Sequence, residues 1–136
     1  MRIKSGLITL LAVPFLVLGG AAVPASAEMH SNCWLTVTTP TTDGTKVYSA
    51  STVKCTTYMS TTAVLVAAKI QEQVLPVWVG RTGWVTNPST GATNLSVTQV
   101  FNCNGRGTDN WRGQGEGTTK DNGKTARDGA SRSLTC

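Results

Sequence analysis

Four cysteines constrain this chain more than any other feature, and all of them follow an N-terminal export signal. They are Cys33, Cys55, Cys103 and Cys136. Outside the cytoplasm such cysteines form disulfides, which small domains need because their hydrophobic cores are limited. Four cysteines allow three pairings. We predict Cys33–Cys55 and Cys103–Cys136, since sequential pairs join segments that can be neighbours in a β-meander.

The first 27 residues have the pattern of a removable signal peptide. Arg2 and Lys4 give a positive start, residues 7–18 are a short apolar run, and Ala25-Ser26-Ala27 is a small-residue cleavage motif. The run is too short to span a bilayer comfortably, although an uncleaved anchor is the alternative. We therefore predict a signal peptide at residues 1–27. A single secreted, extracellular domain follows at residues 28–136, with no membrane attachment after cleavage.

Alternating apolar and polar residues predict β-strands over most of the mature chain. The expected strands cover residues 33–38, 47–58, 61–75, 77–79, 83–85, 94–103, 108–114 and 131–136. Turns are expected at residues 41–44 and 87–91, and a long surface loop at residues 116–130. Residues 61–75 would also suit a short helix, and residues 94–103 are expected to form a central strand. The pattern predicts an all-β fold, a small β-sandwich or Greek-key domain with two disulfides.

Residues typical of catalytic sites are scarce, and we predict that the protein is not an enzyme. The only histidine, His30, lies in an expected flexible tail, and the cysteines have no metal-type spacing, so no zinc site is expected. Glu72 and Glu116 are the carboxylates best placed to enter a cleft, but nothing orients them as a glycosidase pair. The glycine-rich residues 105–117 lack the lysine of a phosphate-binding loop, and residues 121–123 lack calcium-loop spacing. No metal or cofactor is predicted.

The charge of the mature chain is small and dispersed. The whole chain has 12 basic and 7 acidic residues, and two of the basic residues leave with the signal. Towards the C-terminal end the basic residues alternate with Asp109, Glu116, Asp121 and Asp128. A nucleic-acid binder needs clustered positive charge. The pattern therefore predicts no nucleic-acid partner.

Tryptophan and arginine are the residue types with the best claim on function. Exposed Trp and Arg anchor protein interfaces because they bury a large area and also form hydrogen bonds. Trp34 lies on the polar phase of its strand, and Trp111 precedes Arg112 in a polar segment. We predict a binding surface made of Trp34, Arg81, Trp111 and Arg112. We expect Trp78 or Trp84 in the core; carbohydrate stacking is another use of exposed tryptophans, and burial of all four is the alternative.

The segment from Phe101 to Thr108, with Trp111-Arg112 beyond it, resembles many short exported proteins of actinobacteria. These share a cysteine followed by a Gly-x-Gly-Thr element and a strand with an aromatic residue and an arginine. The resemblance covers about the last third of the chain and implies a small secreted two-disulfide β protein of bacterial origin, with no functional residue carried over. Asn110-Trp111-Arg112-Gly113 is also loosely similar to the Ser-Trp-Arg-Tyr turn of the tendamistat type of α-amylase inhibitor, a two-disulfide β-sandwich.

These features predict a secreted, non-catalytic protein-binding module, an adaptor or assembly subunit that docks another exported protein. The alternative is a proteinaceous inhibitor of a secreted hydrolase, which would block a catalytic cleft. A small enzyme is the third possibility, and loss of turnover on substitution of Glu72 or Glu116 would identify it.

Overall fold

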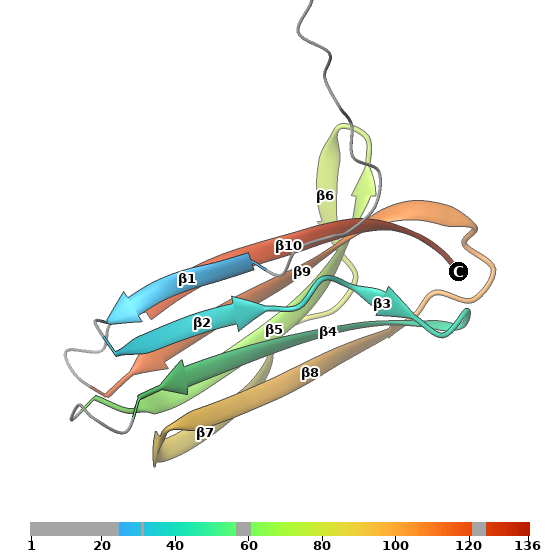
Figure 1. Ribbon diagram of the computed structural model, residues 1–136. Helices are drawn as coiled ribbons and strands as arrows, with labels where there is room; N and C mark the ends of the chain where they lie inside the picture. Colours follow the sequence, from blue (N-terminus) through green and yellow to red (C-terminus); the bar gives the residue numbers. More distant parts are fainter. Residues whose placement is uncertain (1–24, 31, 57–60, 121–124) are drawn as a thin grey trace, which may run out of the picture.

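The computed structural model describes residues 25–30, 32–56, 61–120 and 125–136. In this part of the chain the regular elements are all β-strands, arranged as two antiparallel sheets packed face to face (Figure 1). The strands are β1 (Ala25–His30), β2 (Cys33–Val37), β3 (Thr41–Thr42), β4 (Lys46–Cys55), β5 (Ala63–Val74), β6 (Val77–Gly80), β7 (Val85–Ala92), β8 (Asn94–Asn102), β9 (Thr108–Thr119) and β10 (Thr125–Thr135). The prediction of an all-β, sandwich-like domain with two disulfides is confirmed.

Each sheet is built around one long strand. In the first sheet, β4 pairs with β2 and β3 on one side and with β8 on the other, and β1 extends the sheet beyond β2. In the second sheet, β5 pairs with β9 on one side and with β6 and β7 on the other, and β10 lies beyond β9. The chain passes between the sheets at the β4–β5, β7–β8 and β8–β9 connections. The sandwich is therefore crossed three times by its own chain.

The first disulfide joins Cys33 and Cys55, which are directly paired residues of β2 and β4. It lies in one half of the core, among residues of both sheets. The other buried members of this cluster are Leu35, Val37, Val53, Ala63, Val66 and Leu95. This bridge therefore joins two neighbouring strands within one sheet, as the sequential pairing predicted.

The second disulfide joins Cys103 and Cys136, and it lies in the other half of the core. Its buried neighbours are Val47, Ile70, Trp111 and Leu134. The main chain of Cys136 also exchanges two hydrogen bonds with Gly107, with N···O distances of 2.8 and 3.2 Å. The last residue is thus fixed to the β8–β9 connection by covalent and hydrogen bonds, and the second predicted pairing is confirmed.

Between these two clusters the sheets approach closely, because β9 has glycine at inward positions. Gly113 and Gly115 are buried opposite Ser49 and Ser51 of β4. A Cβ added to Gly113 would lie 2.7 Å from the Cβ of Ser49, and one added to Gly115 would lie 2.5 Å from Cγ2 of Val37. Both distances are far inside van der Waals contact, so the spacing of the two sheets requires glycine here.

These glycines explain why the prediction of a surface loop over residues 116–130 is wrong. β9 and β10 form one long hairpin in this region, with Gly117 paired to Ala126 and Gly113 to Ala130. Beyond Trp111 the inward positions of β9 are small and its outward positions are polar, so this part of the strand lacks the apolar alternation that identifies a half-buried strand. Where sheets pack closely, glycine takes the place of the expected apolar residue.

Several other expectations are corrected. Residues 87–91 belong to β7 and do not form a loop. Residues 94–103 do not form a central strand, since in the described sheets β8 pairs only with β4 and lies at an edge. His30 lies in β1, paired with Cys33, and not in a flexible tail. Residues 61–75 contain the strand β5 and not a helix.

Some predicted segments lie outside the described residues. They are residues 1–24 of the signal peptide, residues 57–58 of the second expected strand, and residues 121–123, which were compared with a calcium loop. The signal peptide remains a prediction. Because β1 begins at Ala25, cleavage after Ala27 would remove the first three residues of this strand.

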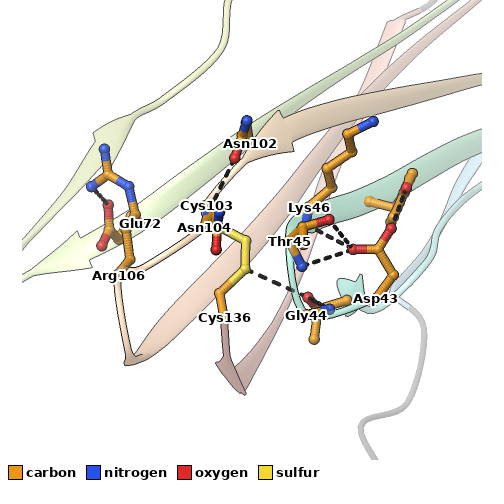
Figure 2. The surroundings of a disulfide bond; sticks show 12 residues. Asp43, Gly44, Thr45, Lys46, Glu72, Asn102, Cys103, Asn104, Arg106 and Cys136 are labelled. Atoms are coloured by element: carbon orange, nitrogen blue, oxygen red, sulfur yellow. Dashed lines mark hydrogen bonds and ion pairs between the residues drawn. A yellow bond between two sulfur atoms is a disulfide. The ribbon is translucent and has the colours of Figure 1, made fainter.

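Next to the second disulfide, a tight turn is organised by Asp43 (Figure 2). One carboxylate oxygen accepts hydrogen bonds from the backbone N–H groups of Thr45 at 2.9 Å and Lys46 at 2.8 Å, and the other accepts from the Tyr48 hydroxyl at 2.8 Å. These bonds favour the charged form and hold the pKa of Asp43 well below its ordinary value. The same contact raises the pKa of Tyr48. The turn connects to the disulfide through a hydrogen bond from the backbone N–H of Cys103 to the carbonyl of Thr45.

We predict that Gly113→Ala lowers the free energy of unfolding by about 1–3 kcal/mol, because the new methyl group must separate the sheets or displace Ser49. Urea denaturation would measure this change. Gly83→Ala is the matched control, since a Cβ at Gly83 meets no atom within 4 Å. Equal stability of the two variants would contradict the close approach of the sheets.

We also predict that Asp43→Asn returns the pKa of Tyr48 towards its ordinary value of 10.0. An ultraviolet titration in a Tyr58→Phe background would observe Tyr48 alone. The pKa of Asp43 is lower in the folded state, so its charge favours folding above the unfolded pKa near 3.8, and this contribution disappears as pH falls through the folded pKa. The stability difference between wild type and Asp43→Asn should therefore shrink in acid; a difference that persists there would contradict this account.

Candidate functional site

The outer surface of the second sheet brings two tryptophans together with three cationic side chains. Inward positions of β9, such as Trp111 and Gly113, alternate with outward ones, such as Arg112. Strands β5, β6 and β10 add their own outward side chains at the same level. We call this surface the tryptophan face. It consists of Lys69, Gln71, Gln73, Trp78, Trp84, Asn110, Arg112, Gln114, Glu116 and Arg127.

Arg112 is held on this face by an aromatic ring and by a hydrogen bond. Its guanidinium carbon lies 4.5 Å from the centroid of the Trp78 ring. Its Nε donates a hydrogen bond of 2.8 Å to the side-chain oxygen of Gln71. Cation–π contact and hydrogen bonding together fix the plane of the guanidinium. Burial lowers the pKa of Arg112.

Trp84 is the second aromatic centre of the face. The ammonium nitrogen of Lys69 lies 4.8 Å from its ring centroid, and the guanidinium carbon of Arg127 lies 5.6 Å from it. Arg127 also forms a double hydrogen bond to one oxygen of Glu116, at 3.1 and 2.6 Å. Trp84 keeps 37% of its surface exposed, so the ring remains accessible beside these cations.

A polar hollow of about 210 Å³ opens at the end of the same face. Its lining residues are Gln73, Leu75, Thr108, Asp109, Asn110 and Ser133. Asn110 donates a hydrogen bond of 2.9 Å to Gln73 across β9 and β5. Beside the hollow, the β5–β6 hairpin protrudes from the sandwich (Figure 1). Its tip is apolar: Leu75 is 83% exposed, and Val74 and Val77 are also exposed.

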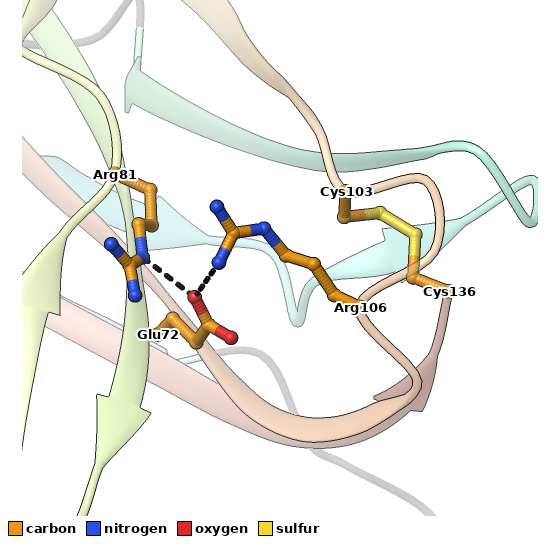
Figure 3. Close-up of polar contacts among 5 residues, drawn as sticks. All are labelled: Glu72, Arg81, Cys103, Arg106 and Cys136. Carbon is orange, nitrogen blue, oxygen red and sulfur yellow. Dashed lines mark hydrogen bonds and ion pairs between the residues drawn. A yellow bond between two sulfur atoms is a disulfide. The ribbon is translucent and has the colours of Figure 1, made fainter.

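A second polar cluster lies on the inward side of the second sheet, around Glu72 (Figure 3). One carboxylate oxygen of Glu72 accepts from Arg81 Nε at 2.6 Å and from Arg106 Nη1 at 2.9 Å. The Glu72 side chain is only 6% exposed, and Arg106 also lies over the Phe101 ring. This cluster ties the β6–β7 connection and the β8–β9 connection to β5. It stabilises the base of the protruding hairpin.

The two carboxylates considered for catalysis cannot act as a pair. Glu72 lies on the inward phase of β5, opposite Trp111, whereas Glu116 lies on the outer face with Arg127. The sheet therefore separates them, while the two carboxylates of a glycosidase must flank one bond. No group of three metal-ligating side chains occurs in the described part of the chain.

The four predicted binding residues do not come together. Trp34 is 39% exposed on the outer face of the first sheet, on the opposite side of the sandwich from Arg112. Arg81 is engaged with Glu72. Trp111 is fully buried against Phe101, with ring centroids 5.7 Å apart, so its expected exposure is wrong. Only Arg112 lies on the tryptophan face.

The expectation that Trp78 or Trp84 lies in the core is also wrong. Trp78 points outward on the short strand β6, and Trp84 lies in the connection that follows it. The expectation rests on the tendency of small β-domains to bury one or two tryptophans against their disulfides. The available signal was the outward phase shared by Trp78 and the polar residues Gln71 and Gln73, which becomes evident only when β6 is paired with β5.

No protein-family model matches this chain, and no curated protein or solved structure matches it. None of the described elements is a helix long and apolar enough to cross a membrane.

We predict that Glu72→Gln lowers the free energy of unfolding by about 1–3 kcal/mol, because the buried negative charge that accepts hydrogen bonds from two guanidinium groups is replaced by a neutral amide. The two arginines are 27% and 37% exposed and regain some water, which limits the cost. Glu116→Gln is the matched control, with an expected loss of about 0.2–1 kcal/mol for an exposed pair. Chemical denaturation would compare them, and an equal or larger loss in the control would contradict this assignment.

Proposed function

We propose that this protein is a secreted, non-catalytic binding module, an adaptor or assembly subunit that docks another exported protein through its tryptophan face. The observation that carries the proposal is the pair Trp78 and Trp84, each held against cationic side chains on the outer face of one sheet. Trp and Arg are enriched among the residues that dominate interface energies. The two disulfides support export, since such bonds persist in oxidising compartments.

The contacts within the face favour this use. Ordering a long side chain on binding costs free energy, and that cost falls when the side chain is already held. Arg112 is held by Trp78 and Gln71, and Arg127 is held by Glu116. The strands beneath them belong to a sandwich braced by a disulfide in each half of its core. The face can therefore meet a partner with little rearrangement.

Retention of a partner by the immobilised protein would test the proposal. The protein would be incubated with the culture medium of its source, and retained proteins would be identified by mass spectrometry. We expect the double variant Trp78→Ala, Trp84→Ala to lose a partner that wild type retains. Hot-spot truncations cost about 2 kcal/mol or more, which corresponds to more than a tenfold loss of affinity.

Trp34→Ala is the matched control, because it removes an exposed tryptophan from the opposite side of the sandwich. Thermal unfolding of each variant would check that the fold is retained. Loss of the partner with Trp34→Ala alone, or equal retention by all variants, would overturn the assignment of the face.

Inhibition of a secreted hydrolase is the second candidate, and the β5–β6 hairpin favours it. A protruding apolar tip can enter a concave catalytic cleft, and exposed apolar groups such as Leu75 mark interaction sites. In that case the protein should reduce a hydrolase activity of the medium, and Leu75→Ser should restore that activity. Retention of a partner with no change in any hydrolase activity would favour the adaptor.

A further inference from the structure

Arg112 differs from the three arginines that form ion pairs in the described structure, and also from Arg132, which forms no ion pair with a described residue but is exposed to solvent. Arg81 and Arg106 bind the carboxylate of Glu72, and Arg127 binds that of Glu116. Arg112 donates only to the neutral amide of Gln71 and forms no ion pair with a described carboxylate. Its two terminal Nη groups have no hydrogen-bond partner among the described residues.

This arrangement leaves a partly desolvated cation without an opposite charge among the residues that the structure describes. Trp78 covers the guanidinium, and burial lowers the pKa of Arg112. Removing a charge from water is costly unless a counter-charge or hydrogen bonds compensate for it. A carboxylate that reaches Arg112 supplies both the counter-charge and the hydrogen bonds. Because Arg112 is already partly buried, binding a carboxylate requires less further loss of water from the guanidinium.

We propose that Arg112 is the recognition site for a carboxylate on an acidic segment of the partner protein. With Nε held by Gln71, the two Nη groups can donate to the two oxygens of one carboxylate. Charge complementarity favours an acidic partner, because the tryptophan face carries Lys69, Arg112 and Arg127 against Glu116 alone. This inference rests on the proposed function and specifies the chemistry of the partner.

The test is an NMR titration of the full chain at low ionic strength, with a capped tetraglutamate peptide as the probe. We expect saturating shifts of the Arg112 Nε–H and the Trp78 indole N–H signals. A capped tetraglutamine peptide should cause none. Arg112→Lys should weaken the peptide affinity by about tenfold or more, since lysine cannot form the paired hydrogen bonds. Arg132→Lys, an exposed site on β10, is the matched control and should leave the affinity within about twofold.

Two results would overturn the proposal. Equal, non-saturating shifts at Arg112, Arg127 and Arg132 would show general attraction between charges. Saturation by a tetragalacturonate but not by the peptide would show that the carboxylate belongs to a saccharide. The wild-type titration decides between these results even if Arg112→Lys folds poorly.

The proposal and the broader function fail separately. A partner that is retained equally by wild type and Arg112→Lys leaves the binding module intact and removes the carboxylate site. Saturable peptide binding at Arg112, with no partner retained from the medium, would support the carboxylate site and contradict the binding module.

Discussion

The close approach of β9 to β4 is the constraint on which the rest of this structure depends. Gly113 and Gly115 allow the second sheet to lie against Ser49 and Ser51 without intervening side chains. Larger residues fill the core on either side of this contact, and each of the two clusters contains one disulfide. The position of β9 is thereby fixed by the core clusters on either side of its glycines. Trp111 is consequently buried, and Arg112, its neighbour in sequence, is presented to solvent.

Features that depend on covalent chemistry or on simple alternation could be predicted from the sequence. The two disulfide pairs and the all-β class are examples. The β9–β10 hairpin could not be predicted, because glycine at inward positions looks the same as glycine in a loop. Only knowledge of the opposing serines distinguishes the two cases.

The candidate site was harder to predict for a related reason. Whether a tryptophan is buried depends on which strand lies beside it, and periodicity within one short strand does not contain that information. Trp78 follows apolar residues and Trp111 follows polar ones, yet Trp78 lies beside Arg112 on the outer face and Trp111 is buried against Phe101. Arg112 could be predicted because arginine is enriched among the residues that dominate interfaces. That argument holds for Arg112 even though Trp111 beside it is buried.

Along β9, residues that face solvent alternate with residues that face the core, so binding and folding depend on different positions of the same strand. Substitutions at Asn110, Arg112 and Gln114 alter the surface offered to a partner, whereas those at Trp111 and Gly113 alter the folding of the chain. Relatives of this protein could therefore diverge in what they recognise while keeping an unchanged interior. The same separation makes the strand a practical scaffold for engineering, since its outward positions can be randomised without disturbing the packing beneath them.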